Sequence, residues 1–287
     1  MTSLEQLSLT HQNDLQGRFK RTHTYIAEYS FANLYLFRNS HGHQLLKHDG
    51  HLFVIGKTYD GKPYIMPTSD LTPEIVDVLY GLSGEYPCVF PVPEEWLGAF
   101  GKYAVSSIWD EGDSDYVYAV EKMATFKGQK LHSKKNLLNQ CVALYKPQPK
   151  PLTRGLMKDA LLVLDAWQDD ATEAKEQTDY FPCREALDHY EDLVLCGGIY
   201  YVDNEPAGFI IGEEINNDMF ALHFAKGKRK FKGMYQFMFN HFAGILPRKY
   251  AFLNFEQDIG KLALRIAKSS YYPDQVIKKY RVTFKHG

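Results

Sequence analysis

The sequence predicts a mixed α/β protein built from two halves with a similar order of elements. Of its 287 residues, 45% are hydrophobic and 14% aromatic, enough for a substantial core. Segments with the apolar spacing of strands and of helices follow one another along the chain. After about residue 128 this order begins again, so we expect two domains, 1–128 and 129–287.

In the first half, capping and turn residues mark the element ends. Ser30 suits the N-cap of a helix, Asp60-Gly61 suits a tight turn between strands, and Thr72-Pro73 opens a helix. The expected elements are a helix at 31–37, strands at 52–55 and 64–66, a helix at 72–82, a strand at 88–92, a short helix from Glu94 and a strand at 116–120.

The second half predicts helices, a three-stranded meander, then helix, strand, helix and strand. Turn residues at 203–204 and 216–218 join the three strands. The expected elements are helices at 134–140, 153–168 and 184–192, strands at 142–145, 195–202, 207–213 and 219–225, a loop at 146–152, helices at 233–246 and 258–268, and strands at 250–254 and 278–284. This is the order of the GCN5-related acetyltransferase (GNAT) fold. We therefore expect two tandem acyl-CoA N-acyltransferase (GNAT)-like domains with mixed sheets.

Composition excludes several classes of protein. The formal net charge is −2, which argues against a protein that coats nucleic acid indiscriminately. The sequence holds no apolar run long enough for a membrane span and no signal-peptide pattern, so we expect a cytoplasmic protein. The four cysteines form no Cys-x-x-Cys pair, and the histidines between 41 and 51 straddle a turn. We expect free thiols and no metal site.

Charges are distributed unevenly along the chain. Seven cations and no acid lie between residues 122 and 150, and five cations lie between 226 and 232. Between 165 and 192 acids dominate instead. Such separation indicates a basic surface for an anionic ligand, although each run alone is equally typical of a solvated face.

The basic segment that follows the strand at 219–225 is the first candidate site. Free N–H groups at the helix start, with Gly233 for close approach, would seat a phosphate or carboxylate. A helix dipole supplies only about 0.3–1 kcal/mol, so the flanking cations Lys228, Arg229 and Lys232 would add most of the attraction. The alternative is an exposed basic turn.

The second candidate is the stretch 124–140. Lys130, Lys134 and Lys135 are spaced to share one side of a helix, where they would grip phosphates of a nucleotide or of transfer RNA. The alternative is a solvated helix face. We expect this stretch and the 226–233 bend to converge on a shared hollow.

The third candidate lies near the C-terminus. Glu256 follows a strand and is the residue expected to accept a proton from an attacking amine, a role typically worth about 10²–10⁴ in rate. Asp258 suits a helix cap. After the helix, Lys268 would hold a phosphate and Tyr271 a leaving group.

Several motifs together resemble those of the bacterial family named for the C-terminal domain of phosphatidylglycerol lysyltransferase. They lie in matching order at 31–37, 115–118, 131–136, 197–198, 232–236, 254–260 and 265–271 with Pro273. The family commonly has Asn-Arg-Glu where this chain has Asn254-Phe255-Glu256. Its members look like tandem GNAT-type folds related to the Fem-type aminoacyltransferases.

The resemblance implies an acyl- or aminoacyltransferase that moves its group from aminoacyl-tRNA or acyl-CoA to an amine or hydroxyl acceptor. It implies no metal, no tightly bound cofactor and no covalent intermediate. Carried over by position, the family's motifs fall on Lys134, Lys135 and Asn136, on Lys232 and Gly233, and on Glu256, Asp258, Arg265 and Lys268. The rival interpretation is a non-catalytic anion- or RNA-binding module that retains the fold.

Overall fold

A computed structural model describes residues 2–22 and 24–286, which form two compact units. Unit 1 comprises residues 1–115, 257–265 and 276–287, and unit 2 comprises residues 116–256 and 266–275. The domains expected from the sequence are 1–128 and 129–287. The division falls at 115/116 instead of 128/129, and two C-terminal segments return to unit 1.

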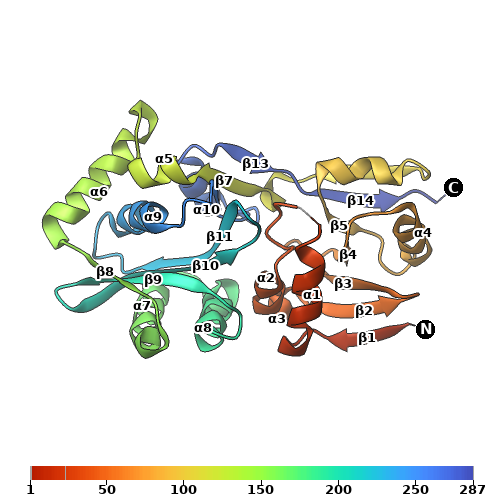
Figure 1. Ribbon diagram of the computed structural model, residues 1–287, viewed down its shortest axis with the longest axis horizontal. Helices are drawn as coiled ribbons and strands as arrows, with labels where there is room; N and C mark the ends of the chain where they lie inside the picture. The colour runs from red at the N-terminus through yellow and green to blue at the C-terminus, as the bar shows by residue number, and fades with distance from the viewer. Residues whose placement is uncertain (1, 23, 287) are drawn as a thin grey trace. The chain divides into compact units, whose positions relative to one another are not determined.

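Unit 1 is built on a seven-stranded mixed sheet in the order β1-β2-β3-β4-β5-β14-β6. Its strands are β1 (Ser3–Gln6), β2 (Gln44–His48), β3 (His51–Lys57), β4 (Pro63–Pro67), β5 (Val89–Val92), β6 (Val105–Trp109) and β14 (Tyr280–Phe284). Strands β4 and β5 pair in parallel, and the other neighbouring strands of this sheet pair antiparallel. The C-terminal strand β14 therefore lies inside the N-terminal sheet (Figure 1).

The helices of unit 1 are α1 (Gln12–Phe19), α2 (Phe31–Leu36), α3 (Arg38–His41) and α4 (Pro73–Leu82). The predicted caps are confirmed, because the Asn33 amide donates to Ser30 Oγ and the Ile75 amide donates to Thr72 Oγ1. Helix α4 turns Ile75, Val76 and Leu79 toward the core of the sheet. The segment from Glu94 is a 3₁₀ helix (Glu94–Phe100).

Unit 2 has a second seven-stranded mixed sheet in the order β13-β7-β12-β11-β10-β9-β8. Its strands are β7 (Asp115–Ala119), β8 (Gln148–Pro151), β9 (Cys196–Val202), β10 (Glu205–Glu214), β11 (Met219–Gly227), β12 (Phe252–Asn254) and β13 (Gln275–Ile277). The meander β9-β10-β11 is antiparallel, as predicted, and β11 pairs in parallel with β12.

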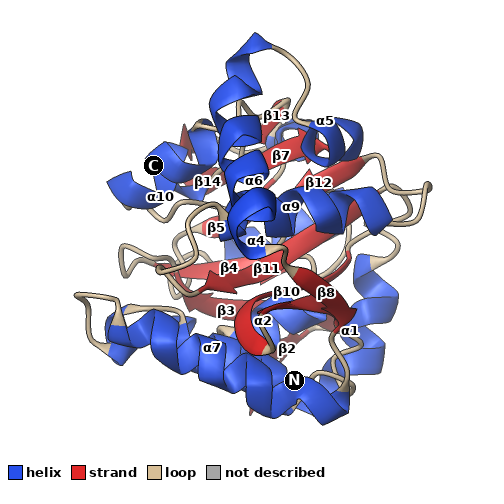
Figure 2. Ribbon diagram, turned by 90° about the vertical axis from the view of Figure 1, so that its left-hand side faces the viewer, coloured by secondary structure: helices blue, strands red, loops and turns tan. Residues whose placement is uncertain are grey.

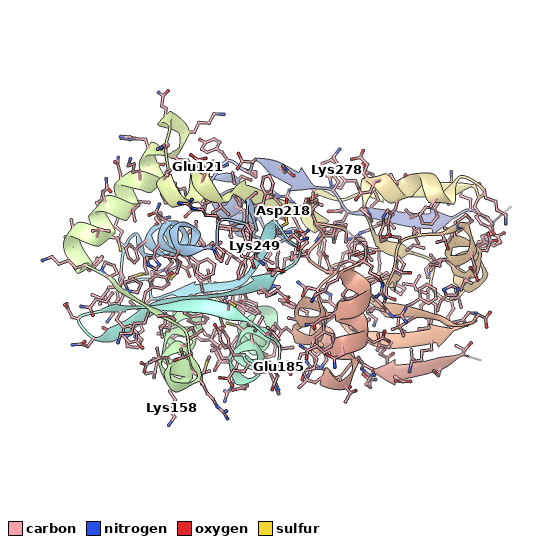
Figure 3. All side chains as sticks on the ribbon, in the orientation of Figure 1. Glu121, Lys158, Glu185, Asp218, Lys249 and Lys278 are labelled. Carbon is pink, nitrogen blue, oxygen red and sulfur yellow. The ribbon has the colours of Figure 1, made fainter. Side chains whose placement is uncertain are left out.

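Helices cover both faces of the second sheet, as Figures 1 and 2 show. They are α5 (Val120–Thr125), α6 (His132–Tyr145), α7 (Met157–Asp169), α8 (Tyr180–Asp188), α9 (Met234–Ile245) and α10 (Leu262–Ser269). Helices α7 and α8 lie on one face, whereas α9, flanked by α5 and α6, lies on the other. Lys158 of α7 and Glu185 of α8 accordingly appear on the side opposite Glu121 of α5 (Figure 3).

The two sheets have corresponding strand orders. In each, an edge strand precedes a three-stranded meander, the meander's last strand has a parallel partner, and an antiparallel strand follows. A helix, α4 or α9, links the parallel strands. The antiparallel strand comes from the other part of the chain in both sheets: β14 in the first and β7 in the second. This exchange explains why the unit boundary differs from the predicted one.

Two predictions near residue 145 are wrong. The expected strand 142–145 is the last turn of α6, which continues to Tyr145, and the expected loop 146–152 contains the edge strand β8. Val142 and Leu144 are exposed on this helix, so their β-like composition reflects no buried strand. Among the described residues, no helix is long and apolar enough to cross a membrane.

Candidate active site

A β-bulge in the central strand of unit 2 carries the histidine of the candidate site. Ile211 pairs with Phe224 and Gly212 pairs with Leu222, so His223 is the extra residue of β11. The backbones approach closely here, because a Cβ on Gly212 would lie 1.9 Å from the Ala221 carbonyl oxygen. Only glycine fits that position, and the bulge changes the direction of the His223 side chain.

His223 lies between two glutamates. Its Nε2 is 2.8 Å from Glu213 Oε1 and its Nδ1 is 2.7 Å from Glu256 Oε1. The histidine side chain is fully buried, and those of Glu213 and Glu256 are 11% and 13% exposed. Charges removed from water in this way need close partners, so the three side chains stabilise one another's ionised forms.

The protonation of His223 follows from these neighbours. Burial by itself disfavours the imidazolium, but the charges and hydrogen bonds of Glu256 and Glu213 outweigh it and raise the pKa of His223 to about 10. At neutral pH the ring is therefore a cation that donates from both nitrogens. The cluster then carries two carboxylates and one imidazolium.

Glu256 has a left-handed backbone, with φ of 60°. Its amide donates to Asn254 Oδ1 at 2.6 Å, and its carbonyl accepts from the Tyr116 amide at 3.3 Å. Lys268 Nζ donates to the Phe255 carbonyl at 2.7 Å and to the Glu256 carbonyl at 3.1 Å. A non-glycine residue keeps this conformation only when its surroundings hold it, and here they fix the carboxylate beside His223.

The structure therefore places Lys268 differently from its predicted role as a phosphate ligand. Its ammonium group is directed at two backbone carbonyls of the Glu256 turn. Through these two bonds it holds the backbone of the Glu256 turn.

The parallel pair β11–β12 opens at this site. Its register covers only Met219–Ala221 against Phe252–Asn254, while β11 continues to Gly227. Among the described residues, no strand pairing joins β11 and β12 beyond Ala221, and His223 and Glu256 lie at this divergence. Alternate amides of β11 point toward its β12 side, where a donor carbonyl would find N–H groups.

Asp258 and Arg265, two further predicted site residues, form an ion pair in unit 1. Arg265 donates to both carboxylate oxygens of Asp258, from Nε at 2.7 Å and from Nη2 at 3.1 Å, and to Glu111 Oε2 at 2.8 Å. Asp258 also accepts from the Gly260 amide at 2.8 Å in the turn before α10, which begins at Leu262, so the predicted helix start at 258 is wrong. Because the Arg265 guanidinium already donates to two carboxylates, we do not assign this ion pair to donor binding.

Tyr271 is buried in an aromatic cluster of unit 2. Its ring contacts Tyr118, Phe126 and Phe239, and its hydroxyl accepts from Gln236 Nε2 at 2.9 Å. Burial raises the pKa of Tyr271. The hydroxyl therefore stays protonated at neutral pH.

The predicted basic residues of the second stretch lie at the start of α6. Lys134 Nζ donates to Ser270 Oγ at 2.6 Å and lies 4.2 Å from the centroid of the Tyr271 ring. Lys130 lies over Tyr272, Lys135 is exposed, and Asn136 contacts His132 one turn earlier. Within residues 2–22 and 24–286, no carboxylate is within ion-pair distance of Lys130, Lys134 or Lys135.

The loop 226–232 is different, because three of its five cations pair with two acids. Lys226 is buried, with Nζ 2.5 Å from Asp179 Oδ1 and 3.5 Å from the Trp167 ring centroid. Lys228 and Lys230 each lie 2.7 Å from a carboxylate oxygen of Glu205. Arg229 and Lys232 remain exposed.

The expected hollow between the two basic stretches is occupied by protein. A Cβ on Gly233, whose φ is 86°, would lie 2.3 Å from the Leu137 carbonyl oxygen and 3.0 Å from Cys141 Cβ. Tyr145 also packs edge-to-face on Phe231. Glycine is needed at 233 because α6 lies against the start of α9. The close approach predicted for a ligand is therefore made by the chain itself.

Sequence reasoning missed Glu213 and His223. The available signal was a histidine inside the otherwise apolar strand Met219–Ala225, which follows the acidic end of the previous strand. Of the histidines between residues 41 and 51, His43 bonds to the Leu34 carbonyl and to the Tyr64 hydroxyl. Over the described ranges, no group of three or more His, Cys, Asp or Glu is arranged to hold a metal ion.

The two units, each a mixed sheet covered by helices with a corresponding strand order, define a tandem α/β protein. The family described as "Phosphatidylglycerol lysyltransferase, C-terminal" matches residues 19–283, and the chain belongs to this family. Among curated proteins, an uncharacterised protein of Mycoplasmoides gallisepticum is 26% identical over 196 residues. That match covers 66% of this chain and 61% of the relative.

Solved structures share the fold over nearly the whole chain. A conserved protein of unknown function from Bacteroides thetaiotaomicron has a TM-score of 0.86 at 24% identity, covering 99% of this chain and 100% of that one. L-PGS from Bacillus licheniformis has a TM-score of 0.67 at 13% identity, covering 99% and 94%. FemX has a TM-score of 0.57 at 7% identity, covering 99% and 97%. The predicted similarity to Fem-type proteins is thus confirmed at the level of the fold.

Proposed function

We propose that this protein transfers an aminoacyl group from aminoacyl-tRNA to an amine or hydroxyl acceptor, with Glu256 as the proton acceptor. The observation that carries the proposal is the Glu256 carboxylate, held by a strained turn against a buried imidazolium where β11 and β12 diverge. A perturbed acid–base cluster at such a place is typical of a reaction centre.

The reaction requires little of the protein beyond positioning and one proton acceptor. The acceptor nitrogen or oxygen attacks the ester carbonyl, a new bond to the carbonyl carbon forms, and the bond to the ribose oxygen breaks. Glu256 takes the nucleophile's proton and returns it to the departing ribose oxygen, so the protons balance. His223 keeps Glu256 in place, and Glu213 holds the other ring nitrogen.

Three observations support aminoacyl-tRNA over acyl-CoA as the donor. The family is named for a lysyltransferase. The Gly233 helix start, where a short pyrophosphate would dock, is covered by α6. Among the described residues, Lys130, Lys134 and Lys135 have no carboxylate at ion-pair distance, and cations that follow one another in this way suit an extended polyanion.

Replacing Glu256 with Gln tests the proposal. We expect transfer to fall by about 10²–10⁴ because the amide accepts no proton, while tRNA affinity changes less than about twofold. The measurement follows radiolabel from a charged tRNA mixture, and in parallel from acyl-CoAs, into a pool of small amines and lipids. Glu214→Gln is the matched control, since Glu214 bonds to Lys249 and Tyr250 instead.

Unchanged transfer by the Glu256→Gln variant would remove Glu256 from the mechanism. Label that moves only from acyl-CoA would overturn the donor assignment. RNA binding without any transfer would favour the non-catalytic module.

The pH dependence gives a second test. Because the pKa of His223 is raised to about 10, the stability contributed by its ion pairs is complete below the unfolded pKa of about 6.5 and is lost as pH rises through 10. We expect the ring resonances of His223 to titrate near pH 10 by NMR. In Glu256→Gln the transition moves to lower pH. A His223 ring that is neutral at pH 7 would contradict the cluster as described.

A further inference from the structure

Three lysines of unit 2 lie over three tyrosine rings, of which that of Tyr272 is exposed and the other two are buried. We call this cluster the lysine–tyrosine surface. Each ammonium lies over one ring, with distances to the ring centroid of 5.4 Å for Lys122 on Tyr118, 5.5 Å for Lys130 on Tyr272 and 4.2 Å for Lys134 on Tyr271. The lysines come from α5, the 3₁₀ turn Gln129–Leu131 and α6, and two of the tyrosines follow α10.

The two adjacent tyrosines differ in exposure. Tyr271 is 5% exposed, whereas Tyr272 is 47% exposed. Tyr272 has a left-handed backbone with φ of 53°, its amide donates to the Ser269 carbonyl at 2.9 Å, and its carbonyl accepts from Lys122 Nζ. A turn that two hydrogen bonds hold in a left-handed conformation thus presents a large aromatic ring to solvent. Packing alone does not require this exposure.

The charge of this surface is positive and largely uncompensated. No acid occurs between residues 122 and 150. Lys122 pairs with Asp274 at 2.6 Å, whereas the part of the chain that the structure describes places no carboxylate at ion-pair distance from Lys130 or Lys134. Lys134 shares its ammonium with the Ser270 hydroxyl. Ser270 Oγ accepts this bond and donates its own proton to the Ala267 carbonyl, so the remaining N–H groups of Lys134 are the donors for a phosphate oxygen.

Buried aromatic rings join this surface to the proposed reaction centre. The Tyr271 ring centroid lies 6.4 Å from that of Tyr118, which lies 4.7 Å from that of Phe255, the residue before Glu256. One aromatic cluster therefore joins the exposed Tyr272 turn to the turn that holds the catalytic carboxylate.

We infer that Tyr272 and Lys130 form a stacking platform for an unpaired nucleobase, with Lys134, which Ser270 positions, holding the adjoining phosphate of a single-stranded RNA end. An exposed aromatic ring flanked by cations is the arrangement by which proteins bind unpaired nucleotides, because every base has a face that stacks. The inference rests on the proposed function, and it adds the subsite that receives the unpaired end of the donor.

Tyr272→Ala and Tyr272→Phe test the platform, because phenylalanine keeps the ring. The probes are a 12-nucleotide single-stranded RNA ending in CCA, a blunt RNA duplex of equal length and coenzyme A, each titrated by fluorescence or calorimetry. We expect Tyr272→Ala to weaken single-strand binding roughly 5- to 150-fold and duplex binding less than about twofold. Tyr272→Phe should bind the single strand like the unaltered protein.

Salt dependence separates the ring from the cations. Tyr272→Ala should leave the slope of log affinity against log salt unchanged, whereas Lys130→Met or Lys134→Met should reduce it by about 1. Equal single-strand affinity of Tyr272→Ala and the unaltered protein would overturn the inference. So would a loss confined to coenzyme A, since that result would mark a nucleotide-carrier site instead.

Failure of the platform and failure of the proposed function are distinguishable. Glu256→Gln should bind the single strand normally, because the carboxylate does not belong to the lysine–tyrosine surface. Ring-dependent binding without transfer would support the platform and reject the transferase proposal. Transfer that is unaffected by Tyr272→Ala at low donor concentration would reject the platform alone.

Discussion

The two basic regions of unit 2 look alike in the sequence and differ in the structure. In the loop 226–232, Lys226, Lys228 and Lys230 all lie within 2.7 Å of a carboxylate oxygen. At the start of α6, Lys130 and Lys134 lie on tyrosine rings. Three of the five loop cations are thus paired with acids of the protein, whereas Lys130 and Lys134 have no carboxylate at ion-pair distance among the described residues.

The acids that make this difference are distant in sequence. Glu205 begins β10, next to the loop across the sheet, and Asp179 directly precedes α8. Surface ion pairs of this kind contribute only about 0–1 kcal/mol each to stability, but each acid weakens the field that would attract an anion. Counting charges along the chain therefore identifies a basic run without showing whether it is available to a ligand.

The largest expected effect concerns Gly233, where the loop meets α6. Gly233→Ala forces a side chain into a left-handed residue and against the Leu137 carbonyl. We expect the free energy of unfolding to fall by about 2–5 kcal/mol, measured by urea denaturation. Gly244→Ala is the control, because Gly244 lies in α9, the helix whose N-cap is Gly233. Its Cβ meets nothing within 4 Å, and alanine should raise stability by about 0.5–1 kcal/mol.

If Gly233→Ala instead kept its stability and lost affinity for phosphate or coenzyme A, the glycine would serve a ligand. The loop would then be the anion site of the molecule. The start of α6 would then not be the basic region that is available to a ligand.

A matched pair of double variants compares the two regions directly. Lys134→Met with Lys135→Met should reduce the salt slope of tRNA binding by about 1–2, and affinity by roughly tenfold at moderate salt, because two phosphate contacts are lost. Lys228→Met with Lys230→Met removes the same charge from the loop and should change the slope by less than about 0.5. Fluorescence anisotropy at several salt concentrations measures both. Equal losses would show that the ion pairs with Glu205 open on binding.

The sequence predicted most of the fold, because its signals are local. Ser30 and Thr72 cap their helices as expected, and the turn residues place the meander β9-β10-β11. The exchange of β7 and β14 was not predictable in this way, since it depends on which sheet each strand joins. Apolar spacing says that a strand is buried without saying beside which neighbour.

The candidate site was predictable only in part, for the same reason. Glu256 was identified from its place after a strand, but the residues that orient it come from three other segments: Glu213, His223 and Lys268. The bulge that turns His223 toward them is a feature of strand pairing. Nothing in the apolar run around His223 encodes the two glutamates that surround it.

The smallest expected effect is also the most direct test of the loop. Glu205→Gln removes the acid shared by Lys228 and Lys230 while keeping the shape of the side chain. Unfolding free energy should change by less than about 1 kcal/mol, because these pairs are surface interactions. The loop should gain affinity for inorganic phosphate or coenzyme A by about two- to fivefold, since a change of 1 kcal/mol corresponds to roughly a fivefold change in binding. Calorimetric titration of both anions measures the gain, with Glu214→Gln as a control for the loss of one acid from the same strand. If neither anion binds better, internal pairing is not what keeps the loop from acting as a site, and the packing of α6 over Gly233 is the remaining physical cause.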